Sequence, residues 1–133
     1  MAKGAVIMDK VLSEKDPIEK GIALFNEGRY CEAGAAWEVP WCATADSGEK
    51  RFLEGMIMLA GAFDSYLCRE CAAAAALLEK GLPLVRSGIN THPNLRLSEL
   101  SGDLEYLMDE FDSCSLRVSP DALPKIERTY IHC

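Results

Sequence analysis

Two glutamates beside two tryptophans are the first residues of this sequence that could carry out chemistry. Glu38 lies between Trp37 and Trp41 on one expected helix, and Glu54 lies on the next helix. Two carboxylates in an apolar cleft can take different pKa values, so that one acts as an acid and the other as a base. They could also hold a hard metal ion, although two carboxylates alone make a poor site. Glu38 and Glu54 are therefore the catalytic candidates, provided that their helices pack antiparallel.

A structural interpretation of the same residues needs no chemistry. The two tryptophans would be core anchors, and the glutamates would bond to helix termini or to Arg29 or Arg51. A motif that has no histidine partner and no known ligand is weak evidence of catalysis. We favour the structural interpretation and keep the paired glutamates as an alternative.

The pair Cys68-x-x-Cys71 is the second candidate for chemistry. Residues three apart on a helix share a face, so both thiolates could reach one zinc ion. Structural zinc takes four ligands, and Cys31 or Cys42 would have to complete the site because the sequence has no second such pair. A thioredoxin-like role fails because no βαβ pattern surrounds the pair. We expect ordinary small residues and six reduced thiols, since disulfide scaffolds are typically small, loop-rich and secreted.

The charge and the motifs of the sequence argue against several classes of function. Fourteen Lys and Arg against 21 Asp and Glu give a net charge of -7, which disfavours a nucleic-acid partner. The uncharged run around residues 55–63 is far shorter than the roughly 18 residues of a membrane span. No nucleotide or phosphate motif is present, so we expect no cofactor. His92 and His132 lie in no nucleophile motif and are expected at the surface. The first residues resemble no secretory leader, and we expect a cytoplasmic protein.

The elements that must position these residues are short helices. Apolar side chains recur every three or four residues, as in Phe52, Met56, Leu59 and Phe63, which is the helical period. The pattern predicts one all-α domain, a compact array of about five short helices over residues 1–133. The helices are expected from Pro17 to a stop at Gly28 and over residues 29–39, 49–68, 70–85 and 98–111, with segments 1–14 and 119–133 irregular.

Glycine, proline and capping residues set the expected boundaries. Asp16 and Asp46 are placed to cap two of the helices. Pro40 should end or kink the second helix, and Gly81 and Pro83 should bend or break the fourth. Gly55 and Gly61 lie inside the third helix, where a glycine indicates that another backbone comes close.

Residues 21–41 read GIALFNEGRYCEAGAAWEVPW. Within them Glu32, Ala33, Trp37, Glu38 and Trp41 fit in register the pattern Glu-Ala-His-Glu-x-Trp-Glu-x-x-Trp. In this the chain resembles domain of unknown function family 309, a small all-helical family. Residues 51–57, RFLEGMI, are similar to the family's Phe-Leu-Gln-Gly-Leu-Ile-Gln. The resemblance implies a helical fold. It implies no activity, because none is established for the family.

The departures from the family pattern fall where chemistry would be. Gly34 and Ala35 stand in place of the family's His and Glu, and Met58 stands in place of a Gln. We expect the space freed by the two small residues to accept an apolar ligand or a partner's side chain. The binding candidates are Glu32, Gly34, Trp37, Glu38, Trp41, Glu54 and Met58.

The expected function is that of a non-catalytic helical binding or scaffolding module. Its partner would be a small molecule or a protein that the sequence does not identify. A small hydrolase-like enzyme using Glu38 and Glu54, with or without the help of a metal ion, is one alternative, and a thiol-based metal or redox protein is another. A homo-oligomer could form through the alanine-rich residues 72–76, because small side chains allow close approach.

Overall fold

The computed structural model of the protein describes residues 16–114 and 119–128. Within these residues the elements are α2 (Pro17–Asn26), α3 (Tyr30–Ala43), α4 (Ser47–Leu67), α5 (Cys71–Arg86), α6 (Leu97–Ser113) and the 3-10 turn η1 (Pro120–Ala122). The same residues contain no β-strand beyond a single isolated bridge between Leu95 and Arg128. The predicted all-α fold of five helices is confirmed. The leader 1–14 and His132 lie outside the described residues.

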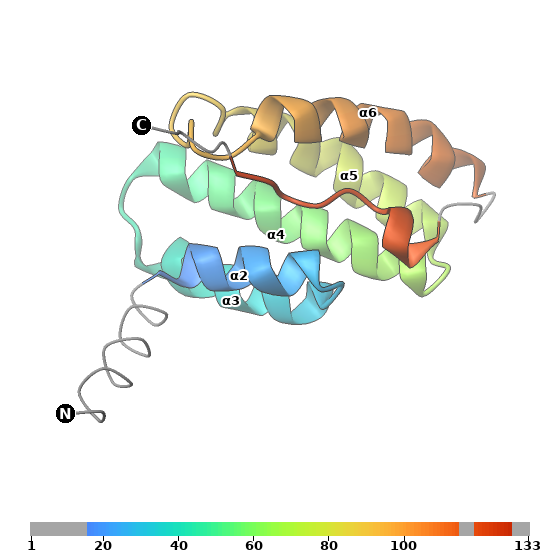
Figure 1. Ribbon diagram of the computed structural model, residues 1–133, viewed down its shortest axis with the longest axis horizontal. Coiled ribbons are helices and arrows are strands. Elements are labelled where there is room, and N and C mark those ends of the chain that lie inside the picture. Colours follow the sequence, from blue (N-terminus) through green and yellow to red (C-terminus); the bar gives the residue numbers. More distant parts are fainter. Residues whose placement is uncertain (1–15, 115–118, 129–133) are drawn as a thin grey trace.

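Helix α4 lies in the middle of the molecule (Figure 1), with α2 and α3 on one side and α5 and α6 on the other. Helices that follow one another in sequence are packed neighbours. Residues 119–128, which we call the strap, run across α4 between the two sides of the molecule (Figure 1). None of the described helices is both long and apolar enough to cross a membrane.

The capping residues expected from the sequence are confirmed. The Asp16 side chain accepts a hydrogen bond of 3.1 Å from the backbone N–H of Glu19 at the start of α2. Asp46 accepts bonds from the N–H groups of Gly48 and Glu49, at 2.8 and 3.1 Å, at the start of α4. Gly28 follows α2 with a φ of 85°, the left-handed conformation in which glycine commonly ends a helix.

The two prolines break neither helix, so the prediction is wrong where it had Pro40 end the second helix or Pro83 break the fourth. Helix α3 continues beyond Pro40 to Ala43, and Pro83 lies inside α5. A proline removes one N–H donor but keeps its own carbonyl as an acceptor. Both carbonyls are used, since Pro40 accepts from Thr44 at 2.9 Å and Pro83 accepts from Ser87 at 3.1 Å. Near the end of a helix the lost bond is therefore not enough to stop it.

The crossing of α4 and α5 is built on two glycines. A Cβ atom on Gly55 would lie only 2.7 Å from the backbone nitrogen of Val85, so the expected approach of another backbone is confirmed there. On the facing helix, a Cβ on Gly81 would lie 3.2 Å from the carbonyl oxygen of Gly55. Gly81 thus allows close packing rather than breaking α5. Gly61 differs from expectation, because it faces the side chain of Leu77 rather than a backbone.

The core is continuous from α2 to α6. Phe25 contacts Tyr30, Trp37 and Phe63 with ring centroids 4.9–5.9 Å apart, and Phe63 contacts Phe111 at 6.2 Å. The apolar stripes that the sequence indicated are buried at 4% exposure or less: Ile22 and Phe25 in α2, Phe52, Met56, Leu59 and Phe63 in α4, and Leu97, Leu100, Leu104, Leu107 and Phe111 in α6. Helical periodicity therefore identified the core correctly.

A disulfide joins Cys71 to Cys114, so the prediction of six reduced thiols is wrong at these two positions. Cys71 is the first residue of α5, and Cys114 caps the end of α6. The antiparallel course of two neighbouring helices brings these ends together, with the two Cα atoms 5.6 Å apart. Cys31, Cys42 and Cys68 are free and exposed, and Cys133 lies outside the described residues.

Candidate functional site

Trp37, the central residue of the sequence motif, is a core residue. Its side chain has no exposed surface, and its indole Nε1 donates a 3.1 Å hydrogen bond to the carbonyl of Ile18 in α2. The indole lies directly on Gly21, where a Cβ atom would come within 2.1 Å of Nε1. Trp37 therefore fastens α3 to α2 and presents nothing to a ligand. The glycine inside the α2 pattern was the signal for this contact.

Trp41 is partly buried, and a lysine of this chain occupies its face. The Lys50 ammonium lies 4.4 Å from the ring centroid, and Nζ also donates a 3.0 Å hydrogen bond to the Trp41 carbonyl. A cation over an indole ring is a favourable arrangement. The indole Nε1 is buried and has no hydrogen-bond partner within the described part of the chain. The sequence interpretation missed Lys50, although it lies in the first turn of α4.

Gly34 does not open the space that its small size suggested. It is buried, and a Cβ atom placed on it would lie 3.7 Å from the Cβ of Ala60, which is ordinary contact distance. Helices α3 and α4 have closed together at this point. Ala35 is exposed on the outer side of α3. The glycine that replaces the family's histidine is therefore part of a helix–helix contact.

The three glutamates of the predicted site differ in their surroundings. Glu32 forms a two-point contact with Arg29, at 2.5 and 2.9 Å, and this carboxylate raises the pKa of the arginine through hydrogen bonding first and charge second. Glu38 is exposed and Glu54 is half-buried. Neither Glu38 nor Glu54 has a hydrogen bond or ion pair among the residues that the structure describes.

The face of α4 that carries Glu54 is turned toward α5 rather than α3. Met58, one turn after Glu54, lies against α5, where a Cβ on Gly81 would be 3.1 Å from the Met58 Cβ. Gly61 on the same face meets Leu77 of α5. Helix α3, which carries Glu38, meets α4 through Ala60 instead. The two catalytic candidates thus stand on different packing faces.

The disulfide removes Cys71 from any metal site, because a bridged sulfur is not a thiolate ligand. The prediction that Cys68 and Cys71 could together bind a metal ion is therefore wrong. Across residues 16–114 and 119–128, no group of three or more His, Cys, Asp or Glu side chains is arranged to hold a metal ion.

His92 is partly buried, which corrects its expected place at the surface. Its Nε2 lies 2.8 Å from Oε1 of Glu49, and its ring stacks on Phe52 at a centroid distance of 4.3 Å. Gly88 also lies against the Phe52 ring, where a Cβ atom would come within 2.2 Å of it. This cluster fixes the loop between α5 and α6 to the start of α4.

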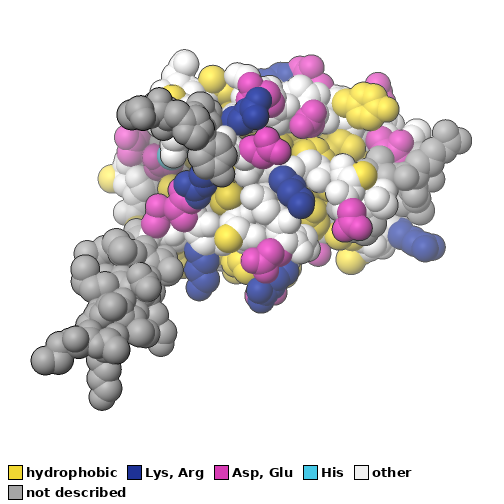
Figure 2. All heavy atoms as spheres, viewed as in Figure 1, with side chains coloured by type: hydrophobic (Ala, Val, Ile, Leu, Met, Phe, Trp, Pro, Cys, Tyr) yellow, Lys and Arg dark blue, Asp and Glu magenta, His cyan; other side chains and the backbone are white. Residues whose placement is uncertain are grey.

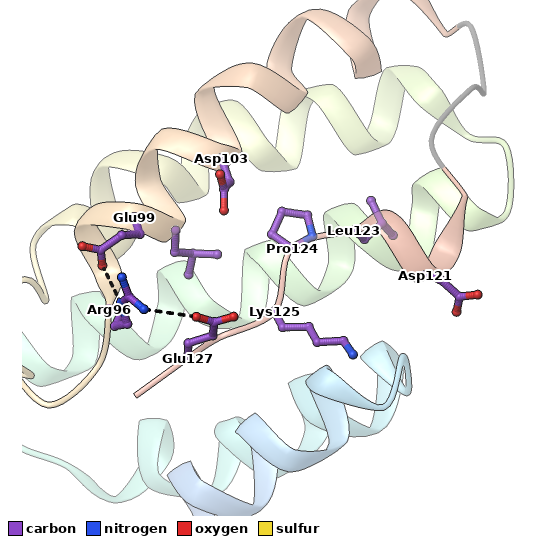
Figure 3. A pocket seen from close by; sticks show the side chains of 9 residues that line it. Arg96, Glu99, Asp103, Asp121, Leu123, Pro124, Lys125 and Glu127 are labelled. Carbon is purple, nitrogen blue, oxygen red and sulfur yellow. Dashed lines mark hydrogen bonds and ion pairs between the residues drawn. The ribbon is translucent and has the colours of Figure 1, made fainter. Parts of the chain in front are cut away.

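Three grooves follow the strap along its length. One of about 370 Å³ lies between the strap and α6, and its lining includes Glu99, Asp103 and Lys125 (Figure 3). A second, of about 220 Å³, is bordered by Tyr30 and the turn after α2. A third, of about 410 Å³, is bordered by Ile22 of α2. None of the binding candidates named from the sequence lines these three grooves.

The part of the strap after η1, residues 124–128, is held as a non-helical segment that runs across α4 (Figure 1). The Asn26 side chain donates from Nδ2 to the carbonyl of Ile126 at 2.9 Å and accepts from the Ile126 N–H at 2.8 Å. A backbone pair between Arg96 N–H and the Glu127 carbonyl, at 2.8 Å, holds the other edge. Leu123 and Ile126 insert into the core with exposures of 3% and 2%. An amide side chain, a backbone edge and two apolar pockets together recognise this segment.

Ion pairs fix the charged side chains on both sides of the strap. Arg96 lies 3.4 Å from a Glu99 oxygen and 3.5 Å from a Glu127 oxygen (Figure 3). Arg128 pairs with Glu19 at the start of α2. On the face that carries the strap, Figure 2 shows acidic and basic side chains interspersed, with apolar side chains between them. The polar rim around two buried apolar residues is typical of a recognition surface.

The five packed helices make this a small all-helical domain. Residues 18–77, a little under half of the chain, match the model of the family described as Domain of unknown function (DUF309). The resemblance to that family is thereby confirmed over α2, α3, α4 and the start of α5. No curated protein and no solved structure matches the chain.

Proposed function

We propose that the protein is a non-catalytic helical binding module whose binding groove, which is the path across α4 that the strap occupies here (Figure 1), takes an extended peptide. The observation that carries the proposal is the two-way hydrogen bonding between the Asn26 side chain and the backbone of Ile126. Such bonds recognise an extended backbone whatever its side chains are. Specificity comes from the two pockets that hold Leu123 and Ile126, which lie three residues apart.

The charges beside the strap suggest what else a ligand would carry. Glu99 and Asp103 stand on the α6 side of the groove, and Glu19 stands on the α2 side. The strap itself carries the basic residues Lys125 and Arg128 beside these acidic side chains. The proposed partner is therefore a protein segment with two apolar residues three apart and basic residues near them.

The positions of Glu38 and Glu54 support a binding role over the paired-glutamate enzyme. An acid and base pair must meet across one substrate, and the face of α4 that carries Glu54 packs on α5, whereas Glu38 belongs to α3. A cytoplasmic location, a small-molecule ligand and self-association through residues 72–76 remain parts of the proposal that stand on composition alone.

A labelled peptide with the sequence of residues 119–128 tests the proposal. It is titrated into the full chain carrying Leu123→Ala and Ile126→Ala, which weaken the strap's own hold on the groove, and binding is followed by fluorescence anisotropy. We expect this variant to bind the peptide at least about tenfold more tightly than the unaltered chain, because a tethered segment competes at high effective concentration.

The control adds Asn26→Ala to the same variant, and binding should then be lost. A second control peptide exchanges its Leu and Ile with its Lys and Glu. Equal binding of both peptides, or no binding to a variant whose far-ultraviolet spectrum shows intact helices, would contradict a peptide-binding groove.

A further inference from the structure

Three cysteines meet where α4, α5 and α6 end or begin. Cys71, the first residue of α5, is bonded to Cys114 at the end of α6. Cys68 caps α4 only three residues before Cys71, and it is a free and exposed thiol. A free thiol next to a disulfide is the arrangement that thiol–disulfide exchange requires.

The turn between α4 and α5 holds Cys68 near Cys71. The N–H of Glu70 donates a 2.8 Å bond to the carbonyl of Ser65, which closes the end of α4, and α5 begins at the next residue. Only Arg69 and Glu70 separate Cys68 from Cys71, so the connection between the two helices keeps the free thiol near the bridged sulfur along the chain. A disulfide between them requires a Cα separation of roughly 4.4–6.8 Å.

The backbone is unusual at this same place. Among the described residues, the non-glycine residues with positive φ are Arg69, at 64°, and Cys114, at 53°. The left-handed conformation is unfavourable for residues with a side chain. Arg69 stands between the two neighbouring cysteines, and Cys114 belongs to the disulfide itself. The two positive φ values thus mark the ends of α4 and α6 at which the three cysteines lie.

We propose that Cys68, Cys71 and Cys114 form a thiol–disulfide exchange site in which one disulfide moves between two pairings. The thiolate of Cys68 attacks Sγ of Cys71, the Cys68–Cys71 bond forms as the Cys71–Cys114 bond breaks, and Cys114 leaves as a thiolate. The proton lost by Cys68 goes to solvent, and Cys114 takes one up from solvent. One disulfide and one thiol are present before and after, so the step needs neither oxidant nor reductant.

The exchange changes what the disulfide links while leaving the helices packed. Before it, the bond joins α5 to α6, and after it the bond lies within the α4–α5 turn. The end of α6 stays against α4 because Phe111 stacks on Tyr66 with ring centroids 4.5 Å apart. Cys114 is already exposed, so its new thiol is accessible to solvent. A disulfide that shifts in this way fits a protein of a reducing compartment, where disulfides are usually transient.

Disulfide mapping of the full chain tests the exchange. Protein isolated without reductant is incubated at about pH 8, a pH at which thiol–disulfide exchange is commonly followed, and its thiols are then blocked with N-ethylmaleimide before non-reducing peptide mapping. We expect two populations: Cys71–Cys114 with Cys68 blocked, and Cys68–Cys71 with Cys114 blocked. Cys68→Ser should lose the second population together with the label on Cys114. The matched variant Cys31→Ser, which removes another exposed thiol, should keep both.

Recovery of the Cys71–Cys114 bond alone from the unaltered chain would overturn the proposal. So would a Cys68–Cys114 bond, because the attack would then be on the other sulfur. A yield of Cys68–Cys71 that rises with protein concentration would also overturn it, since exchange would then occur between molecules. The decisive measurement uses the unaltered chain, so a folding defect in a variant cannot produce these results.

Discussion

Trp37 determines which residue can stand at position 21. Its indole lies where a Cβ on Gly21 would be, and its N–H needs the Ile18 carbonyl of the same helix. A methyl group at Gly21 must push the ring away and break that hydrogen bond. We expect Gly21→Ala to lower the free energy of unfolding by about 1–3 kcal/mol, the usual cost of overpacking, as measured by urea denaturation.

Gly102 provides the matched control for this substitution. It also lies within a helix, α6, but a Cβ atom there would meet nothing within 4 Å. Gly102→Ala should therefore raise the free energy of unfolding by up to about 1 kcal/mol, because alanine favours the helix. Equal effects of the two substitutions would contradict the close contact between Gly21 and Trp37.

Tyr30 links stability to alkaline pH. Burial raises the pKa of its phenol, so the folded protein keeps the proton at a pH where the unfolded chain releases it. Burial of Tyr30 therefore leaves the free energy of unfolding unchanged below about pH 10, the ordinary pKa of tyrosine in an unfolded chain. It lowers the free energy of unfolding as the pH rises above that value. We expect Tyr30→Phe to lose less stability than the unaltered chain between about pH 9 and 11, measured as urea midpoints. Identical pH profiles would contradict this role of Tyr30.

At the scale of elements, the strap is the piece that joins the two sides of the helix array. Asn26→Ala removes both hydrogen bonds to Ile126 and leaves a largely buried backbone group without a partner. We expect a loss of about 1–3 kcal/mol in the free energy of unfolding. Hydrogen exchange should locate the effect, with the Ile126 amide losing protection while amides of α4 keep theirs.

Asn94→Ala is the control for that substitution. Asn94 is exposed in the loop before α6, and no hydrogen bond of its side chain is found in the described part of the chain. Its substitution should change stability by less than about 0.5 kcal/mol. If Asn26→Ala were equally mild, the strap would be held by its apolar residues alone.

The helices could be predicted from the sequence because their signals are local. The spacing of Phe52 to Phe63 and the cap at Asp46 depend only on residues a few positions apart. The predicted end of the second helix at Val39, before Pro40, was wrong because a proline's cost depends on how many bonds remain beyond it. That number is set by tertiary packing, which the local pattern does not contain.

The groove could not be predicted because its contacts join distant residues. Asn26 belongs to the segment that resembles the family, yet its partner Ile126 is 100 positions later. The faces of α4 were equally ambiguous, since Glu54 could have been turned to either neighbour. The face that carries Glu54 is turned toward α5 because the two helices cross closely at Gly55 and Gly81. This crossing depends on residues of both helices, so the sequence of α4 alone does not predict it.

At the scale of the whole molecule, the disulfide closes a loop that contains most of α5 and all of α6. Cys71 and Cys114 are 43 positions apart. A loop of that length predicts a stabilisation of about 4 kcal/mol through the restricted unfolded chain. We expect a strong reductant to lower the urea midpoint of the unaltered protein by an amount consistent with this value or smaller.

The double variant Cys71→Ala with Cys114→Ala separates this effect from any other action of the reductant. It should unfold at the same urea concentration with and without reductant. If the urea midpoint of the unaltered chain were the same with and without reductant, the disulfide would contribute nothing to the stability of the fold.

The position of the strap after α6 also bears on how the chain is made. Synthesis delivers Asn26 long before Ile126, and at about 5–20 residues per second the interval is roughly 5–20 seconds. Helices α2 to α5 can pack on one another during that time, whereas α6 ends at Ser113, only 13 residues before Ile126. The segment that joins the two sides of the helix array (Figure 1) is therefore added after the helices that it crosses.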